Sequence, residues 1–208
     1  MIQRIKNKLG RILLSLIPAD SLALKLADLK GDKWSAYCDF GRDVRFGPKS
    51  KVVNSPLNRH KIKIQGETII DGELLVFPYG GEINIGNGTY LGPDSRIWSG
   101  EKILIGENVL ISHLVHISDT SAHEPESEIR AQRFKELYRK GLPDTKSTIV
   151  TAPIIIENNV WINNHVIITR GVTIGQGSII AAGSIVTKSI PPYSFAAGNP
   201  AKVLKQVS

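Results

Sequence analysis

Residues 154–190 read IIIENNVWINNHVIITRGVTIGQGSIIAAGSIVTKSI, and this stretch decides the fold. An aliphatic residue stands at every sixth position, and a second position, mostly small or β-branched, follows four residues after each of them. Two inward positions in every six residues fit neither an amphipathic helix nor a simple hairpin strand. The first series is Ile156, Ile162, Ile168, Ile174, Ile180 and Val186, and the second is Val160, Val166, Val172, Ser178, Ser184 and Ile190.

A coil with three short flat faces satisfies this pattern, because each six-residue unit then supplies one strand and one corner. Eighteen residues complete a turn, and stacked turns place their aliphatic side chains above one another. Glycines such as Gly106 and Gly177 favour corners where φ is positive or where a Cβ atom would crowd the next turn. We therefore predict an all-β protein built as a parallel β-helix.

The six-residue repeat also occurs earlier in the chain, but two segments lack it. From Ala36 to Phe77, short β-like runs alternate with turn residues without a regular period. After Ile117 the repeat stops, which predicts an extended loop at 119–153 that is long for a plain connection. Within this loop, residues 126–141 read as a short helix with a glycine at its end. The repeated aliphatic residues in this earlier part are Ile85, Leu91 and Ile97 and, after a two-residue shift, Ile105, Ile111 and Ile117.

The N-terminal segment follows a helical pattern instead. Residues 2–16 carry apolar side chains at helical spacing and basic side chains on the other face, and a second short helix is expected at 21–30. We therefore divide the chain into a helical segment, 1–34, and a β-helix domain, 35–208. The basic helix either contacts an anionic membrane surface through residues 1–17 or packs on the protein body or a neighbouring subunit.

The composition fits one sizeable domain of 208 residues. Apolar residues make up 41% and aromatic residues 6%, so small aliphatic side chains must fill the core. The net charge of +7 implies attraction to anions, but the loop at 119–153 holds six basic and six acidic residues and does not read as a nucleic-acid arm. The single cysteine, Cys38, excludes an internal disulfide framework and favours a reducing compartment, the cytoplasm. No apolar run is long enough to span a bilayer.

Four motifs occur together and in order between Ile154 and Lys205: NVWI, GSIVTK, a pair of prolines and GNPAK. This stretch resembles the hexapeptide-repeat acyltransferase superfamily, and in particular the galactoside, maltose and polysaccharide O-acetyltransferases. The resemblance covers residues 85–205 and implies a left-handed coil, which departs from the usual right-handed crossover. It also implies a homotrimer with acetyl-CoA lying between neighbouring coils, so an isolated protomer would hold half of each site.

The resemblance assigns the catalytic histidine to His123, at the start of the extended loop. A sugar hydroxyl becomes a good nucleophile only as its proton is removed, and a histidine suits that task near neutral pH. Direct transfer needs no covalent enzyme intermediate, so Cys38 is not required as a nucleophile. Asp119 or Glu124 either orients His123 through its second ring nitrogen or is a solvated loop charge.

The same resemblance transfers cofactor contacts to five residues near the C-terminus. The galactoside enzyme has arginines at the positions of Lys202 and Lys205, so the phosphate contacts here lose the bidentate guanidinium. It also has a serine at the position of Asn164. Trp161 should point outward and line a groove or a subunit interface. The expected acetyl-CoA contacts are Asn164, Ala182, Thr187, Lys202 and Lys205.

The predicted function is acetyl-CoA-dependent O-acetylation of a sugar, in surface polysaccharide biosynthesis, without a metal. N-acetylation of an amino-sugar is the alternative acceptor chemistry. A metal-dependent hydratase related to the β-helical carbonic anhydrases and a non-catalytic scaffold are the alternatives of other classes. His113 and His116 raise the metal question, but residues three apart on a strand point to opposite faces.

Overall fold

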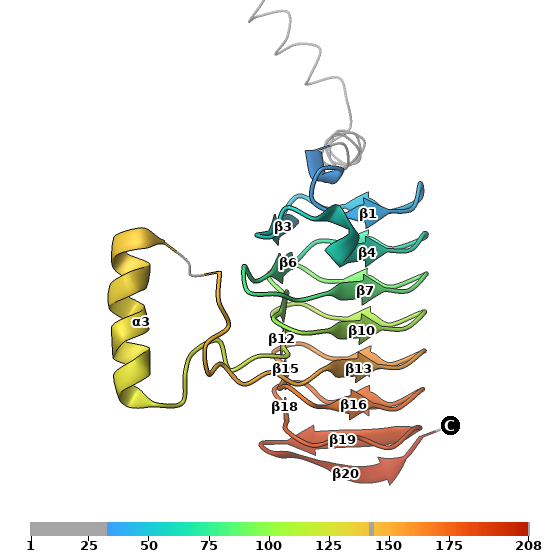
Figure 1. Cartoon of the computed structure of the whole chain (residues 1–208). Helices are drawn as coiled ribbons and strands as arrows, with labels where there is room; N and C mark the ends of the chain where they lie inside the picture. Colours follow the sequence, from blue (N-terminus) through green and yellow to red (C-terminus); the bar gives the residue numbers. More distant parts are fainter. Residues whose placement is uncertain (1–32, 142–143, 208) are drawn as a thin grey trace, which may run out of the picture.

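The computed structural model describes residues 33–141 and 144–207. These residues form a left-handed parallel β-helix whose turns stack in a column, with one helix standing beside it (Figure 1). The predicted fold is therefore confirmed. The two helices expected at 2–16 and 21–30 lie outside the described residues, and so does the proposed membrane contact of residues 1–17.

Three sheets form the faces of the column, and each turn visits them in the order A, B, C. Sheet A holds β1 (Asp39–Phe40), β4 (Ile62–Ile64), β7 (Ile83–Ile85), β10 (Ile103–Ile105), β13 (Ile154–Ile156) and β16 (Thr173–Ile174). Sheet B holds β2 (Arg45–Phe46), β5 (Ile69–Ile70), β8 (Tyr90–Leu91), β11 (Leu110–Ile111), β14 (Trp161–Ile162), β17 (Ile179–Ile180), β19 (Ser194–Gly198) and β20 (Ala201–Gln206). Sheet C holds β3 (Lys51–Asn54), β6 (Glu73–Val76), β9 (Arg96–Ser99), β12 (His116–Ser118), β15 (Ile167–Ile168) and β18 (Ile185–Val186).

The strand register reproduces the predicted turn of eighteen residues in the lower part of the column. Ile155 pairs with Thr173 on sheet A, and Trp161 pairs with Ile179 on sheet B. The aliphatic residues of both repeated series are buried; Ile156, for example, is 1% exposed and Val186 is 0% exposed. Because burial of apolar surface drives folding, these stacked rungs are the main source of the column's stability.

The coil begins earlier than the regular repeat indicates. Residues 39–76 already form two turns, and β1 pairs in parallel with β4, and β3 with β6. Their period is irregular because extra residues sit at the corner between sheets C and A, where the short 3-10 helix η1 (Arg59–Lys61) lies. We call this the C–A corner, and the corner between sheets B and C the B–C corner.

Glycine serves both roles expected of it at the corners. Gly177 adopts a φ of +68°, a conformation that side chains with a Cβ rarely take. At Gly106 a Cβ atom would lie 2.3 Å from Asn158 Oδ1 of the next turn. Successive turns therefore approach more closely than a larger residue would allow.

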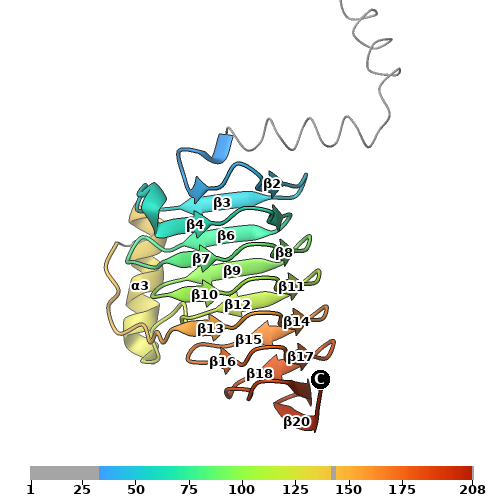
Figure 2. The same cartoon turned by 90° about the vertical axis from the view of Figure 1, so that its right-hand side faces the viewer.

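Two elements leave the regular column. The segment expected as a short C-terminal tail is instead an antiparallel hairpin, in which β20 pairs with β19 and extends sheet B. Between β12 and β13, the chain leaves the C–A corner and forms α3 (Ser127–Lys140), which stands beside the column (Figure 2). Within the described residues, no helix is both long and apolar enough to cross a bilayer.

Candidate active site

The loop that carries His123 is closed at its neck by backbone hydrogen bonds between its two ends. Ser121 N donates to Val150 O at 2.8 Å, and Ala152 N donates to Asp119 O at 2.9 Å. Ser121 Oγ also donates to the carbonyl of His123 at 2.8 Å. The His123 side chain is exposed, so the neck fixes its backbone while the ring stays accessible to a substrate.

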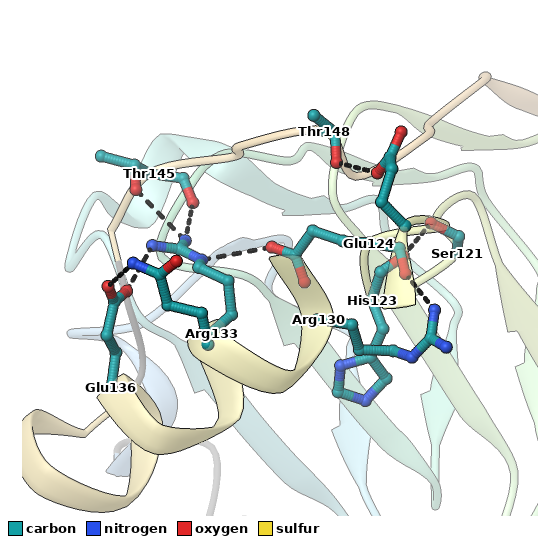
Figure 3. Close-up of polar contacts among 10 residues, drawn as sticks. Ser121, His123, Glu124, Arg130, Arg133, Glu136, Thr145 and Thr148 are labelled. Atoms are coloured by element: carbon teal, nitrogen blue, oxygen red, sulfur yellow. Dashed lines mark hydrogen bonds and ion pairs between the residues drawn. The ribbon is translucent and has the colours of Figure 1, made fainter. Parts of the chain in front are cut away.

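Glu124 ties this loop to α3 (Figure 3). Its carboxylate is buried at 3% exposure and accepts a hydrogen bond from Arg133 Nε at 3.2 Å, while its carbonyl accepts one from Arg130 Nη1 at 2.7 Å. Arg133 Nη2 also donates to the carbonyl of Thr145 at 2.6 Å, on the returning strand of the loop. One guanidinium thus joins α3, the segment after His123 and the return path.

Asp119 anchors the base of the loop to the turn above it. It is fully buried, and it accepts hydrogen bonds from Ser99 Oγ at 2.7 Å, Gly100 N at 2.6 Å and Glu101 N at 3.1 Å. Burial raises the pKa of its carboxyl, whereas these donors act in the opposite direction.

The expectation that Asp119 or Glu124 orients His123 is not supported by these contacts. Neither carboxylate is solvated, because both are buried. Each accepts hydrogen bonds from donors other than the His123 ring. Within the described part of the chain, no hydrogen bond joins either carboxylate to the imidazole. Asp119 instead connects the start of the loop to the turn of Ser99, and Glu124 connects the loop to α3.

A pocket of about 510 Å³, including its open mouth, lies beside His123. Its column side is the C–A corner after β6, where the rings of Phe77 and Tyr79 stack with centroids 5.1 Å apart. Tyr79 Oη lies 3.2 Å from Thr120 Oγ1, and burial raises the pKa of this phenol. The sequence reading missed this wall, since Phe77 and Tyr79 lie more than 40 residues before His123. The lining is Phe77, Pro78, Tyr79, Ala122, His123, Glu124, Arg133, Phe134, Leu137 and Ile149.

The five expected cofactor residues fall into three groups. Asn164 and Ala182 stack at the B–C corner, where Gly183 N donates to the Asn164 carbonyl at 3.0 Å. Thr187 follows β18 at the C–A corner, on the same edge of sheet C as the His123 loop. Lys202 and Lys205 are exposed on β20, and Lys205 Nζ lies 5.5 Å from the centroid of the Phe195 ring. In one chain, sheet C therefore separates Asn164 and Ala182 from His123.

Trp161 points outward as expected, with 44% of its surface exposed. It lies in a column of outward side chains on sheet B, between Leu110 above and Ile179 below. The column runs in register through Ile69, Tyr90, Leu110, Trp161, Ile179 and Phe195.

The remaining histidines do not form a metal cluster. His113 is exposed at the B–C corner, with its ring 5.9 Å from that of His165, whose Nδ1 lies 3.1 Å from Asn164 Nδ2. His116 lies on β12 against Trp98, and burial lowers its pKa. Among residues 33–141 and 144–207, no group of three potential metal ligands occurs.

Comparison with known proteins gives matches to sequences and to structures. Residues 153–188 match the family model described as bacterial transferase hexapeptide (six repeats). Galactoside O-acetyltransferase of Escherichia coli (strain K12) is 42% identical over 132 residues, which cover 64% of this chain and 58% of that protein. The chain thus spans less than two thirds of the length of this curated relative.

Two solved structures share the column. A galactoside acetyltransferase in complex with coenzyme A is 35% identical, with a TM-score of 0.52 and coverage of 68% of this chain and 66% of that chain. The N-acyltransferase AntD from Bacillus cereus is 20% identical, with a TM-score of 0.66 and coverage of 86% and 89%, a likeness of fold alone. Over residues 153–188 the chain thus carries the bacterial transferase hexapeptide repeat, and it resembles the galactoside O-acetyltransferases.

Proposed function

We propose that this protein is an acetyl-CoA-dependent O-acetyltransferase that acylates a sugar hydroxyl, with His123 as the general base. The observation that carries the proposal is the 42% identity to a galactoside O-acetyltransferase. The site supports it, because His123 is an accessible histidine that lines an open pocket. A galactoside acetyltransferase in complex with coenzyme A, 35% identical to this chain, supports acetyl-CoA as the donor.

The chemistry requires one base and two positioned reactants. His123 takes the proton of the acceptor hydroxyl as the oxygen attacks the thioester carbonyl. The carbon–sulfur bond then breaks, and CoA leaves as the thiol with the proton that His123 had taken. Holding both reactants together in a reactive geometry lowers the barrier to direct transfer, so no covalent enzyme intermediate is needed.

The placement of the expected cofactor residues supports a homotrimer. Asn164 and Ala182 lie at the B–C corner, whereas His123 leaves from the C–A corner, across the width of sheet C. A donor lying along the B–C corner of one protomer therefore meets His123 of a neighbour more readily than its own. Lys202 and Lys205 place two positive charges on the last strand, where the nucleotide phosphates of the donor would need them.

The outer side of sheet B also supports association. Its apolar column includes Leu110 at 51% exposure and Trp161 at 44% exposure, and a contiguous exposed apolar strip marks an interaction surface. We assign this strip to subunit contacts or to the wall of the cofactor groove. Light scattering of the purified protein at micromolar concentration tests the trimer directly, and a monomer would contradict it.

We place the reaction in the biosynthesis of a surface polysaccharide and in the cytoplasm. The single cysteine, Cys38, is buried, and burial with the nearby Asp39 raises its pKa to about 12, so it fits a structural role in a reducing compartment. The basic N-terminal segment would hold the enzyme against the inner face of an anionic membrane.

The experiment that tests the proposal is an acetyl-CoA consumption screen. Free sugars, amino-sugars, glycosides and lipid-linked saccharides are offered to the full-length protein, and the acylated product is analysed by mass spectrometry. Ester formation on a saccharide supports the proposal, whereas amide formation on an amino-sugar assigns N-acetylation. No transfer to any acceptor, with coenzyme A binding absent in calorimetry, would contradict a transferase.

A further inference from the structure

The end of the column where β1 lies is strongly basic (Figure 1). Residues 33–63 form this end, with the first turn and the start of the second, and they hold eight basic and two acidic residues. Residues 64–157, by contrast, hold eight basic and fourteen acidic residues. The positive charge of the protein is therefore concentrated away from the middle of the column. We call residues 33–63 the basic end.

The cations of the basic end surround the column on every side. Arg42 is exposed at the corner between sheets A and B, and Lys49 is exposed at the B–C corner. Arg45 is exposed on sheet B and Lys63 on sheet A, while Arg59 lies at the C–A corner. A polyanionic chain is matched by a stripe of charge along one face, whereas a ring of charge around one end matches a flat anionic surface.

Most of this charge is not neutralised within the protein. Arg59 pairs with Asp39, and Lys51 pairs with Glu73 at 3.3 Å. Five other cations of the basic end form no ion pair with a described residue: Lys33, Arg42, Arg45, Lys61 and Lys63. Their charge is therefore available to attract an anionic partner.

An apolar side chain stands among these charges. Leu57 is 73% exposed in the insertion after β3, two residues before Arg59. Its φ is +52°, and its N–H donates to the carbonyl of Asn54 at 3.0 Å, so a closed turn presents the side chain to solvent. Basic residues around an exposed apolar side chain are suited to the surface of an anionic bilayer, where charge attraction and apolar burial add together.

We propose that the basic end is a docking surface for an anionic lipid bilayer, formed by its exposed cations and by Leu57. The inference extends the membrane contact proposed for residues 1–17 to the folded column, and it does not require acetyl transfer. Docking by this end stands the column on the bilayer. Three strand spacings of about 4.8 Å separate the first turn from the fourth, so the His123 loop leaves the column about 14 Å from the first turn.

The other end of the column offers a matched control. Residues 158–207 hold four basic residues and no acidic one, and Arg170 and Lys188 are exposed there. A double variant, Arg42→Glu with Lys63→Glu, changes the basic end, and Arg170→Glu with Lys188→Glu makes the same change in net charge at the other end. All four side chains are exposed, so both variants keep the buried core intact.

The test measures sedimentation of the full-length protein with vesicles of phosphatidylcholine and phosphatidylglycerol. We expect the Arg42 and Lys63 double variant to bind these vesicles about tenfold more weakly or less, because each cation near an anionic surface contributes to the affinity. The Arg170 and Lys188 double variant should stay within about twofold of the wild type. Equal weakening in both variants, or binding of the wild type to vesicles of phosphatidylcholine alone with the same affinity, would overturn the inference.

Leu57→Asn tests the apolar contact separately, since asparagine tolerates a positive φ. Leu204→Asn is its control, because Leu204 is 63% exposed on β20 at the other end of the column. We expect Leu57→Asn to weaken vesicle binding about three- to tenfold, as partial burial of one leucine provides. The control should bind as the wild type does, and an equal loss in both would contradict a contact through Leu57.

Two further measurements separate this surface from other sources of binding. In the full-length chain, changing Arg4, Lys6, Lys8 and Arg11 to glutamine tests the N-terminal segment. If this variant loses vesicle binding while the Arg42 and Lys63 double variant binds as the wild type does, the contact belongs to the segment and the inference is overturned. Hyaluronate, a soluble anionic polysaccharide, is the second probe. If the Arg42 and Lys63 double variant loses hyaluronate binding but keeps vesicle binding, the surface recognises a polysaccharide and the inference likewise fails.

Discussion

Sheet C has a corner at each of its two edges, and the two corners are built differently. In the last four turns the B–C corner keeps a residue with positive φ at the same place, with a φ of +58° at Leu114, +57° at His165 and +71° at Gly183. The C–A corner takes every large insertion: η1, the segment 77–82 and the 119–153 loop with α3. The strands on both sides of each insertion stay in register, as β12 with β15.

The difference shows how a stacked coil acquires a site. Each rung requires only its inward residues, and the entropic cost of a longer connection grows slowly with length. One corner can therefore lengthen while the core is preserved. Here the lengthened corner carries His123 and the pocket, and the short corner carries the cofactor candidates Asn164 and Ala182, which fits a function placed on an unchanged scaffold.

The strongest test of this comparison is His123→Ala at the lengthened corner. We expect the acetyl transfer rate to fall by about two to four orders of magnitude, because the acceptor loses its base. Steady-state assays of CoA release measure the transfer rate. Calorimetric titration with CoA checks that donor binding, proposed at the B–C corner, is retained. Undiminished turnover would remove His123 from the mechanism.

The same substitution, isoleucine to alanine, distinguishes the stability of the column from that of the loop. Ile180→Ala removes a fully buried rung of the column, and we expect it to lower the free energy of unfolding by about 2–5 kcal/mol. Ile149→Ala changes a buried residue of the loop, and we expect about 1 kcal/mol or less, since the loop can open while the column stays folded. Denaturant titration compares the two, and equal losses would show that the loop unfolds only with the column.

Arg133→Met tests whether the link between α3 and Glu124 positions His123. The buried Glu124 carboxylate loses its cationic partner, which in a buried pair costs about 3–5 kcal/mol, and local opening of the loop relieves this cost. We expect kcat to fall about tenfold and cleavage within 119–153 by a protease to increase. The column should melt at an unchanged temperature.

Arg139→Met is the control, because Arg139 is an exposed residue in the last turn of the same helix. Arg133→Lys separates position from charge: it keeps one cation but cannot span Glu124 and Thr145 together. We expect it to restore part of kcat without changing the KM for acetyl-CoA. The same loss in Arg139→Met would argue against a positioning role for Arg133.

At the short corner, Ala182→Phe is expected to change donor binding. A ring on this exposed corner occupies space where the pantetheine arm is proposed to lie, so we expect CoA affinity to weaken about tenfold. Ala36→Phe makes the same change at an exposed residue just before β1 and should leave affinity unaltered. Calorimetric titration with CoA measures both, and equal affinities would move the donor away from the B–C corner.

Much of the column could be read from the sequence, because each rung repeats locally. The aliphatic residues at every sixth position from Ile156 to Val186 are buried as predicted, and the helix expected at 126–141 is present as α3 at Ser127–Lys140. The first turns were included in the β-helix domain at 35–208, but their individual strands could not be predicted, since insertions at the C–A corner hide the period of their inward residues. The β19–β20 hairpin escaped because its strands lack the six-residue repeat.

The candidate site was predictable only in part. The position of His123 followed from a family resemblance, whereas its surroundings did not. Asp119 and Glu124 lie within four residues of His123 in the sequence, but their carboxylates accept hydrogen bonds from Ser99 and Arg133. No local pattern reports such contacts, because their partners are up to 20 residues away in the sequence.

The sequence by itself determined the coil, since a rung at every sixth residue is a local condition that each turn meets on its own. Tertiary structure decided what stands at each corner. Stacking brings Tyr79 beside Thr120 and places His123 and Asn164 on opposite edges of sheet C. The physical reason is that corner residues contact the turns above and below, so their neighbours depend on the length of every insertion between them.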